Sequence, residues 1–122
     1  MAQLVIAALD LSDDPLDAST EFLTEVAPAA RKMLSSSGPV PGLQSSDTLD
    51  AVAFVFSGVT KEHYGWRLAA IQSLAREAAP KRVNGVAGDD YETSRAATDW
   101  LANAPGITGQ LLAVDGKTAE IG

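Results

Sequence analysis

Short apolar runs alternate along this chain with longer segments in which apolar residues recur at helical spacing. The apolar runs are residues 4–9, 51–56, 83–87 and 109–114, and the segments with helical spacing are residues 15–35, 62–79 and 91–102. A continuous apolar run is typical of a strand that is covered on both faces, as strands of parallel sheets are. Strands that alternate with helices are typical of βαβ units. The alternation therefore predicts an α/β fold with a parallel sheet of about four strands.

Proline, aspartate and glycine mark the boundaries of these segments. Asp14 is suited to cap a helix whose first residue is Pro15. Pro28 lies inside the first helical segment and should kink it, because proline has no backbone donor. Residues 35–50 are rich in Ser, Gly and Pro and form the longest stretch without periodicity, so we expect a mobile surface loop there.

Composition excludes several classes of function. The chain has 122 residues, a net charge of −7, no cysteine and one histidine, His63. This length fits a single domain over residues 1–122, and nine scattered basic residues do not predict nucleic-acid binding. Without cysteine there is no disulfide or thiolate site, and one histidine cannot build a multi-histidine metal centre. The apolar run at residues 4–9 is too short to cross a bilayer, so we expect no membrane insertion and a cytoplasmic protein.

Three ordered motifs in the last third of the chain carry a family resemblance. Residues 73–80 read SLAREAAP, residues 82–88 read RVNGVAG, and residues 107–116 read ITGQLLAVDG. Together they resemble the helix ending, the next strand and the closing strand of the short-chain dehydrogenase/reductase family. The resemblance implies a Rossmann-like three-layer fold with a truncated parallel sheet that corresponds to the second half of that family. It also implies one bent helix over residues 15–35, because the family commonly has a proline near Pro28.

The motifs that the family uses for its cofactor and its chemistry are absent or displaced. No Gly-x-Gly-x-x-Gly or Gly-x-x-x-Gly-x-Gly spacing follows any strand, and residues 7–10 read AALD where the family has Asn-Asn-Ala-Gly. Ser57 stands where the family serine is expected. Counting back from residue 73 puts Thr60 at the catalytic tyrosine and Tyr64 at the lysine. Using Tyr64 as the tyrosine instead puts Leu68 at the lysine. We therefore expect no cofactor, no metal and no reductase activity, with Ser57 and Tyr64 as vestiges of a catalytic site.

The remaining polar candidates have structural explanations. His63 near a helix start is expected to be a surface histidine, although it could serve as an acid–base group. Asp89 and Asp90 precede a predicted helix and are expected to cap it rather than bind a metal. Asn84 lies within a predicted strand and is expected to have a structural role.

These observations predict a non-catalytic short-chain dehydrogenase/reductase-like subunit that acts in assembly. The resemblance implies that the helices at residues 15–35 and 62–79 contact a neighbouring subunit, either a second copy or a complete, active reductase. The expected interface residues are Phe22, Val26, Met33, Trp66 and Leu74. Two alternatives stay open: a small oxidoreductase-related enzyme with a repurposed site near Ser57 and Tyr64, and a module that binds a small acyl or nucleotide ligand.

Overall fold

The computed structural model describes residues 2–35, 49–58, 61–114 and 119–121. Its elements follow the predicted alternation of strands and helices. In chain order they are β1 (Ala2–Ala8), α1 (Pro15–Glu21), η1 (Phe22–Val26), α2 (Ala27–Ser35), β2 (Leu49–Ser57), α3 (Lys61–Ala78), β3 (Arg82–Gly88), α4 (Tyr91–Ala102), β4 (Leu111–Val114) and β5 (Ala119–Ile121). Most of the loop predicted over residues 35–50 lies outside the described residues.

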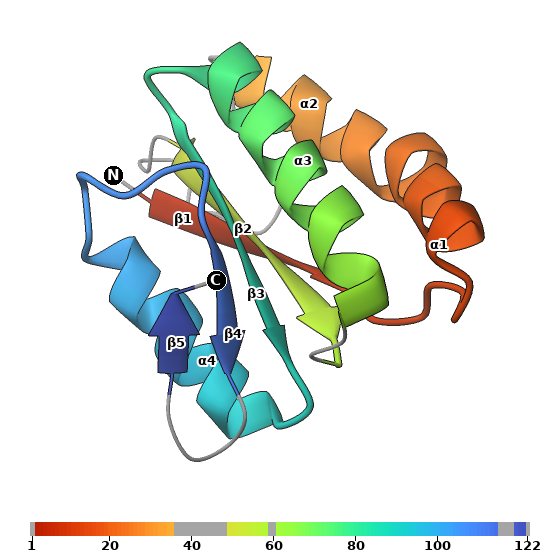
Figure 1. The fold of residues 1–122 in the computed structure, drawn as a ribbon. Coiled ribbons are helices and arrows are strands. Elements are labelled where there is room, and N and C mark those ends of the chain that lie inside the picture. Colours follow the sequence, from red (N-terminus) through yellow and green to blue (C-terminus); the bar gives the residue numbers. More distant parts are fainter. Residues whose placement is uncertain (1, 36–48, 59–60, 115–118, 122) are drawn as a thin grey trace.

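The five strands form one sheet in which the spatial order is the chain order, β1-β2-β3-β4-β5 (Figure 1). Strands β1 to β4 are parallel, and Val52 of β2 is paired with Leu4 on one side and Val83 on the other. The predicted parallel sheet of about four strands is thereby confirmed. Strand β5 runs antiparallel to β4 and was not predicted, because three residues are too few to show a period.

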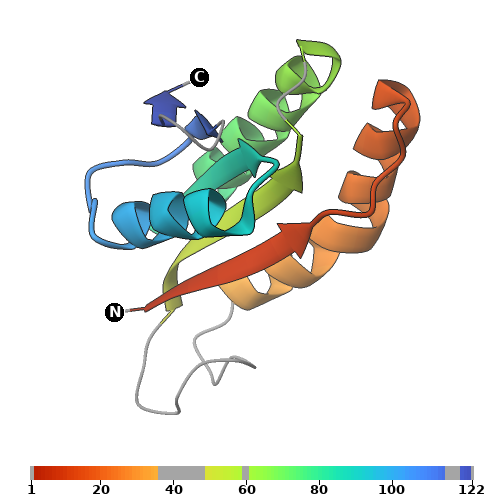
Figure 2. The same cartoon turned by 90° about the horizontal axis from the view of Figure 1, so that it is seen from below.

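Helices cover both faces of the sheet. Helices α1, α2 and α3 lie on one face and α4 lies on the other, which gives three layers (Figures 1 and 2). Each face has its own core: Phe22, Phe54 and Ile71 belong to the larger one, and Val86 and Leu101 to the smaller. The β2 strand is apolar on both sides because it is buried in the middle of this sandwich.

The first helical segment is continuous from Pro15 to Ser35, and it contains one π-helical turn over Phe22–Val26. At the end of this turn the N–H of Ala27 donates to the carbonyl of Phe22, five residues back. The next residue, Pro28, has no N–H to donate, and its ring would crowd the carbonyl four residues earlier in a regular α-helix. A wider turn immediately before Pro28 relieves that crowding. The expected single helix is confirmed, with a π-helical turn as its irregularity.

The ends of two helices agree with the predicted caps. The carboxylate of Asp14 accepts the N–H of Asp17, and the carboxylate of Asp90 accepts the N–H of Thr93. Each interaction satisfies a donor that a helix start otherwise leaves unpaired. Within the described residues, no helix combines the length and the apolar character needed to span a membrane.

Candidate functional site

A cavity of about 220 Å³ lies at the carboxyl ends of β1, β2 and β3. Open α/β sheets commonly bind ligands at this edge. The residues that line the cavity are Ala8, Leu11, Ser12, Asp13, Ser57, Gly58, His63, Arg67 and Asp89. The fold therefore brings Ser57 and His63 into one cavity, but Tyr64 does not line it. Tyr64 is partly buried and packs against the larger core instead.

The Ser57 hydroxyl joins the ends of two strands. Its Oγ donates to the carbonyl oxygen of Leu9 at 3.1 Å, so it links the end of β2 to the residue just beyond β1. The structure gives no hydrogen bond between Ser57 and His63. A serine nucleophile requires a base within hydrogen-bonding reach of its hydroxyl, and His63 is not placed in that role.

His63 is buried, with only 8% of its surface exposed, so the expectation of a surface histidine is wrong. Its Nδ1 accepts the indole N–H of Trp66 at 2.9 Å, and its Nε2 lies 3.1 Å from the carbonyl oxygen of Asp13. Because an indole nitrogen only donates, Nδ1 must be unprotonated and Nε2 must carry the proton that Asp13 accepts. The bond from Nε2 links α3 to the segment that follows β1, whereas the bond at Nδ1 lies within α3 and fixes the orientation of the ring.

Arg67 is the residue of this cavity that the sequence reasoning missed. It is 6% exposed and it donates from Nη1 to the carbonyl of Gly58 and from Nη2 to the carbonyl of Ser57. Its guanidinium carbon lies 5.0 Å from the ring centre of Phe56 and 5.8 Å from that of Trp66, within cation–π range. Burial lowers the pKa of the Arg67 guanidinium from its ordinary value. A signal was available, because His63, Arg67, Ile71 and Leu74 fall on one helical stripe.

The cavity does not bring together Ser57 and Tyr64, the two residues that the family resemblance marks as vestiges of a catalytic site. Thr60, which the sequence register aligns with the catalytic tyrosine, lies outside the described residues. Tyr64 packs against the larger core, whereas the hydroxyl of Ser57 donates to a main-chain carbonyl. No group of three or more His, Cys, Asp or Glu residues that could hold a metal ion occurs in the described part of the chain.

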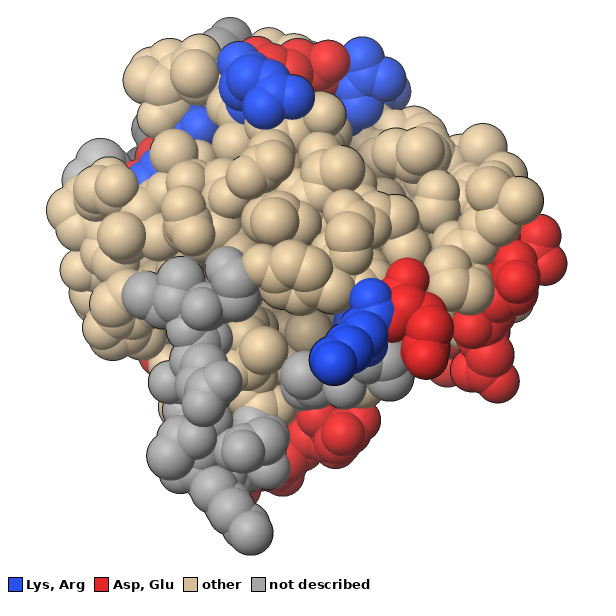
Figure 3. Space-filling model, in the orientation of Figure 1, with Lys and Arg blue, Asp and Glu red and all other residues tan. Residues whose placement is uncertain are grey.

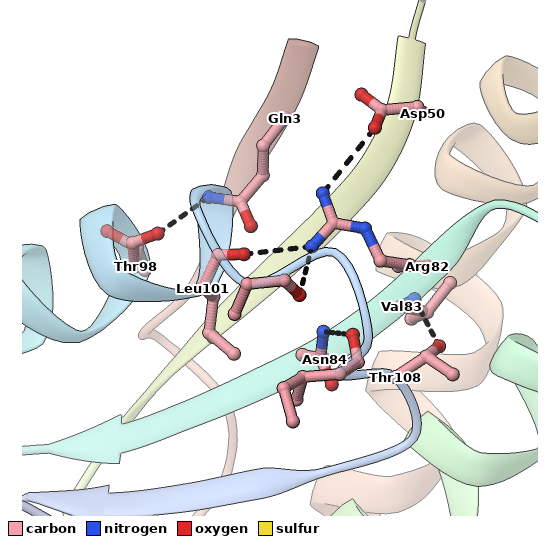
Figure 4. Close-up of polar contacts among 10 residues, drawn as sticks. Gln3, Asp50, Arg82, Val83, Asn84, Thr98, Leu101 and Thr108 are labelled. Atoms are coloured by element: carbon pink, nitrogen blue, oxygen red, sulfur yellow. Dashed lines mark hydrogen bonds and ion pairs between the residues drawn. The ribbon is translucent and has the colours of Figure 1, made fainter. Parts of the chain in front are cut away.

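The second and third of the motifs that carry the family resemblance form a polar clamp between the start of β3 and the turn before β4 (Figure 4). Asn84 is fully buried in β3, and its side chain donates to the carbonyl of Ile107 and accepts the N–H of Gln110. The hydroxyl of Thr108 accepts the N–H of Val83. Gly109 has a φ of +73°, a conformation that glycine adopts without strain. The clamp fixes the turn that leads into β4, which confirms the structural role expected for Asn84.

Arg82 extends this clamp to the end of α4. Its Nη1 donates to the carbonyls of Leu101 and Ala104 at 2.9 and 2.8 Å, and its Nη2 lies 3.5 Å from the carboxylate of Asp50 (Figure 4). One buried guanidinium thus donates to two main-chain carbonyls at and just beyond the C-terminus of α4, where a positive charge is favourable. Its role is therefore structural.

The five residues expected at an interface lie on or near the α1–α3 side of the sheet. Phe22 has no exposed surface, and its ring packs against Phe54, Phe56 and Trp66 at centroid distances of 5.1, 5.4 and 5.7 Å. Leu74 is 7% exposed, whereas Val26, Met33 and Trp66 are partly buried against the larger core. Any contact of Phe22 with a partner would have to be made through its neighbours.

Parallel strands in chain order, helices on both faces and a cavity at the carboxyl edge define a Rossmann-like α/β protein. Residues 6–114 match a family model described as short chain dehydrogenase-like protein. Since the match covers most of the chain, the chain belongs to the short chain dehydrogenase-like family. No curated protein and no solved structure matches it.

Proposed function

We propose that this chain is a non-catalytic short chain dehydrogenase-like subunit that associates through the face formed by α1, η1, α2 and α3. The observation that carries the proposal is an apolar groove of about 460 Å³ between these helices. Its lining includes Leu23, which is 53% exposed, together with Ala27, Trp66, Ala69 and Leu74. Exposed apolar surface of this kind is typical of protein contact sites.

Apart from one ion pair in the lining of the groove, the charges of this face lie around it. Among the described residues that line the groove, only Arg31 and Glu77 are charged, and they neutralise each other through hydrogen bonds of 2.7 and 2.9 Å. Figure 3 shows charged side chains at the ends of α3 and along α1, while the middle of α3 carries none on its surface. An uncharged centre with a charged rim is the usual anatomy of an interface.

The charged residues around the groove are also arranged so that two copies of the face could pair with opposite charges in contact. Asp14 and Asp17 lie at the start of α1, whereas Lys32 and Arg76 lie near the ends of α2 and α3. A two-fold axis through the middle of the face brings the acidic end of one copy against the basic end of the other. The first partner to test is therefore a second copy, and the second is a complete short-chain dehydrogenase/reductase.

The site geometry supports the non-catalytic part of the proposal. The Ser57 hydroxyl and both His63 nitrogens are engaged with main-chain or indole groups, and Tyr64 does not line the cavity. General acid–base chemistry requires a group that reaches the substrate. We therefore favour a role in assembly over the alternative of an enzyme with a repurposed site near Ser57 and Tyr64.

Solution mass over a range of concentrations tests the proposal. The wild-type chain is expected to be a dimer, and Ala69→Glu is expected to be a monomer, because it places a charge in the middle of the groove. Trp100→Glu is the matched control, since Trp100 is 51% exposed on α4, on the opposite face of the sheet. A dimer that Ala69→Glu leaves intact would contradict this face. A wild-type monomer that also fails to bind a complete reductase would contradict assembly altogether.

A further inference from the structure

Arg67 carries a buried positive charge that forms no ion pair with any described residue. No carboxylate in the described residues lies within ion-pair distance of it, and its two hydrogen bonds go to the neutral carbonyls of Ser57 and Gly58. Its Nε is buried and has no hydrogen-bond partner. Buried charges in proteins are normally paired, because removing a charge from water is costly.

The guanidinium retains donors for a ligand. Arginine has five N–H groups in a fixed fork, and the two hydrogen bonds above use one from each terminal nitrogen. The aromatic rings of Phe56 and Trp66 hold the group at the cavity that Arg67 lines. An anion that enters this cavity meets a guanidinium whose position is already fixed.

We propose that the cavity at the carboxyl ends of β1, β2 and β3 binds a small, singly charged carboxylate with Arg67 as its counter-ion. The planar fork of arginine matches the two oxygens of a carboxylate. The cavity volume of about 220 Å³ suits a ligand smaller than a drug-sized molecule. This ligand site is separate from the assembly face, so it stands or falls independently of the proposed function.

The charge of the ligand follows from two aspartates. Asp13 and Asp89 line the same cavity, and both are exposed to solvent. Arg67 can pair directly with one carboxylate, whereas a second negative charge on the ligand would lie near both aspartates with no further arginine or lysine in the cavity lining. The cavity therefore selects a monocarboxylate over phosphate, and it disfavours the pyrophosphate of a nucleotide.

Titration of the isotope-labelled 122-residue chain in chloride-free buffer, followed by NMR, tests this site. Acetate is expected to produce saturable shifts at the Arg67 Nε–H and at the amides of Ser57 and Gly58, while phosphate produces much weaker ones. Absence of a saturable shift with acetate would overturn the proposal. Phosphate binding as tight as acetate would overturn the charge argument, and binding of chloride alone would overturn the carboxylate assignment.

Three variants distinguish the contribution of Arg67 to acetate binding from that of other charged residues. Arg67→Met is expected to abolish the acetate shifts, whereas Arg76→Met leaves them unchanged, because Arg76 is exposed and donates only to Ser73. Asp89→Asn removes one repelling charge and is expected to tighten acetate binding about two- to fivefold. If Arg67→Met fails to fold, the wild-type Arg67 resonance and Asp89→Asn still decide the matter. Unchanged or weaker binding in Asp89→Asn contradicts the proposed charge selection.

Discussion

The side-chain oxygen of Asn84 accepts the main-chain N–H of Gln110 at 3.0 Å, across 26 residues of sequence. The amide nitrogen of the same side chain donates to Ile107, so one fully buried residue pairs two main-chain groups of the turn before β4. No neighbouring strand pairs those two groups, so the turn depends on this side chain.

Replacing Asn84 by leucine keeps much of the side-chain volume but leaves the Ile107 carbonyl and the Gln110 N–H without a partner. We expect a loss of about 2–4 kcal/mol in the free energy of unfolding. Urea denaturation measures this. The control is Asn103→Ala, which removes an exposed asparagine that donates to Asp99, and it should change stability by less than about 0.5 kcal/mol. Equal effects of the two variants would show that the clamp contributes nothing specific.

Trp66→Phe keeps an aromatic ring next to Phe22 and Phe56 but removes the donor to His63. Because His63 is buried, its Nδ1 then has no partner, and we expect a loss of about 1 kcal/mol. Trp100→Phe makes the same chemical change at a half-exposed position on α4 and should be close to neutral. Equilibrium unfolding in urea distinguishes the two. Equal stabilities would indicate that the indole–imidazole bond within α3 does not stabilise the fold.

Two glycine-to-alanine changes should have opposite signs. An added Cβ at Gly88 would lie 2.5 Å from Val114 and 2.9 Å from the Ser94 hydroxyl, so Gly88→Ala should cost about 1–3 kcal/mol through overpacking. An added Cβ at Gly65, inside α3, meets nothing within 4 Å. Gly65→Ala should therefore stabilise the chain by about 0.5–1 kcal/mol. Thermal unfolding at low concentration, where association is minimal, checks both signs.

Hydrogen bonds from the Arg31 guanidinium lower the pKa of the exposed Glu77 carboxyl, with a further contribution from its charge. A lowered pKa in the folded state means that the stabilisation is present above the ordinary glutamate pKa. It is lost as pH falls through the lowered value. Arg31→Met should move the Glu77 titration to higher pH, as followed by carboxyl carbon NMR. Lys32→Met is the control and should leave it in place. The effect on stability should be small, because exposed ion pairs contribute little.

The sequence predicted the sheet well because its strands are apolar on both sides and its helices are periodic. The bounds of α4 matched the prediction, and those of β2, α3 and β3 differed by one or two residues. The fourth parallel strand begins at Leu111 rather than residue 109, because Gly109 and Gln110 belong to the clamped turn. Strand β5 was missed since its pairing with β4 is tertiary.

The candidate site was less predictable for a physical reason. A sequence shows that His63 is polar and Arg67 is charged, but not that Phe56 and Trp66 surround them. Histidine and arginine side chains are fully buried in proteins much less often than apolar ones, so their residue types alone predict exposure. Their spacing on the apolar stripe of α3 was the one available signal against that assignment. Burial of a charge depends on neighbours that are distant in sequence, so periodicity alone could not establish it.

The strand order of the sheet has a consequence for how the chain folds. Each of β2 to β5 lies beside the strand that precedes it in the chain, so no strand of the described sheet has to enter between two that are already paired. During synthesis each strand from β2 onward finds its neighbour already outside the ribosome. The described sheet can therefore grow in one direction, from β1 towards β5.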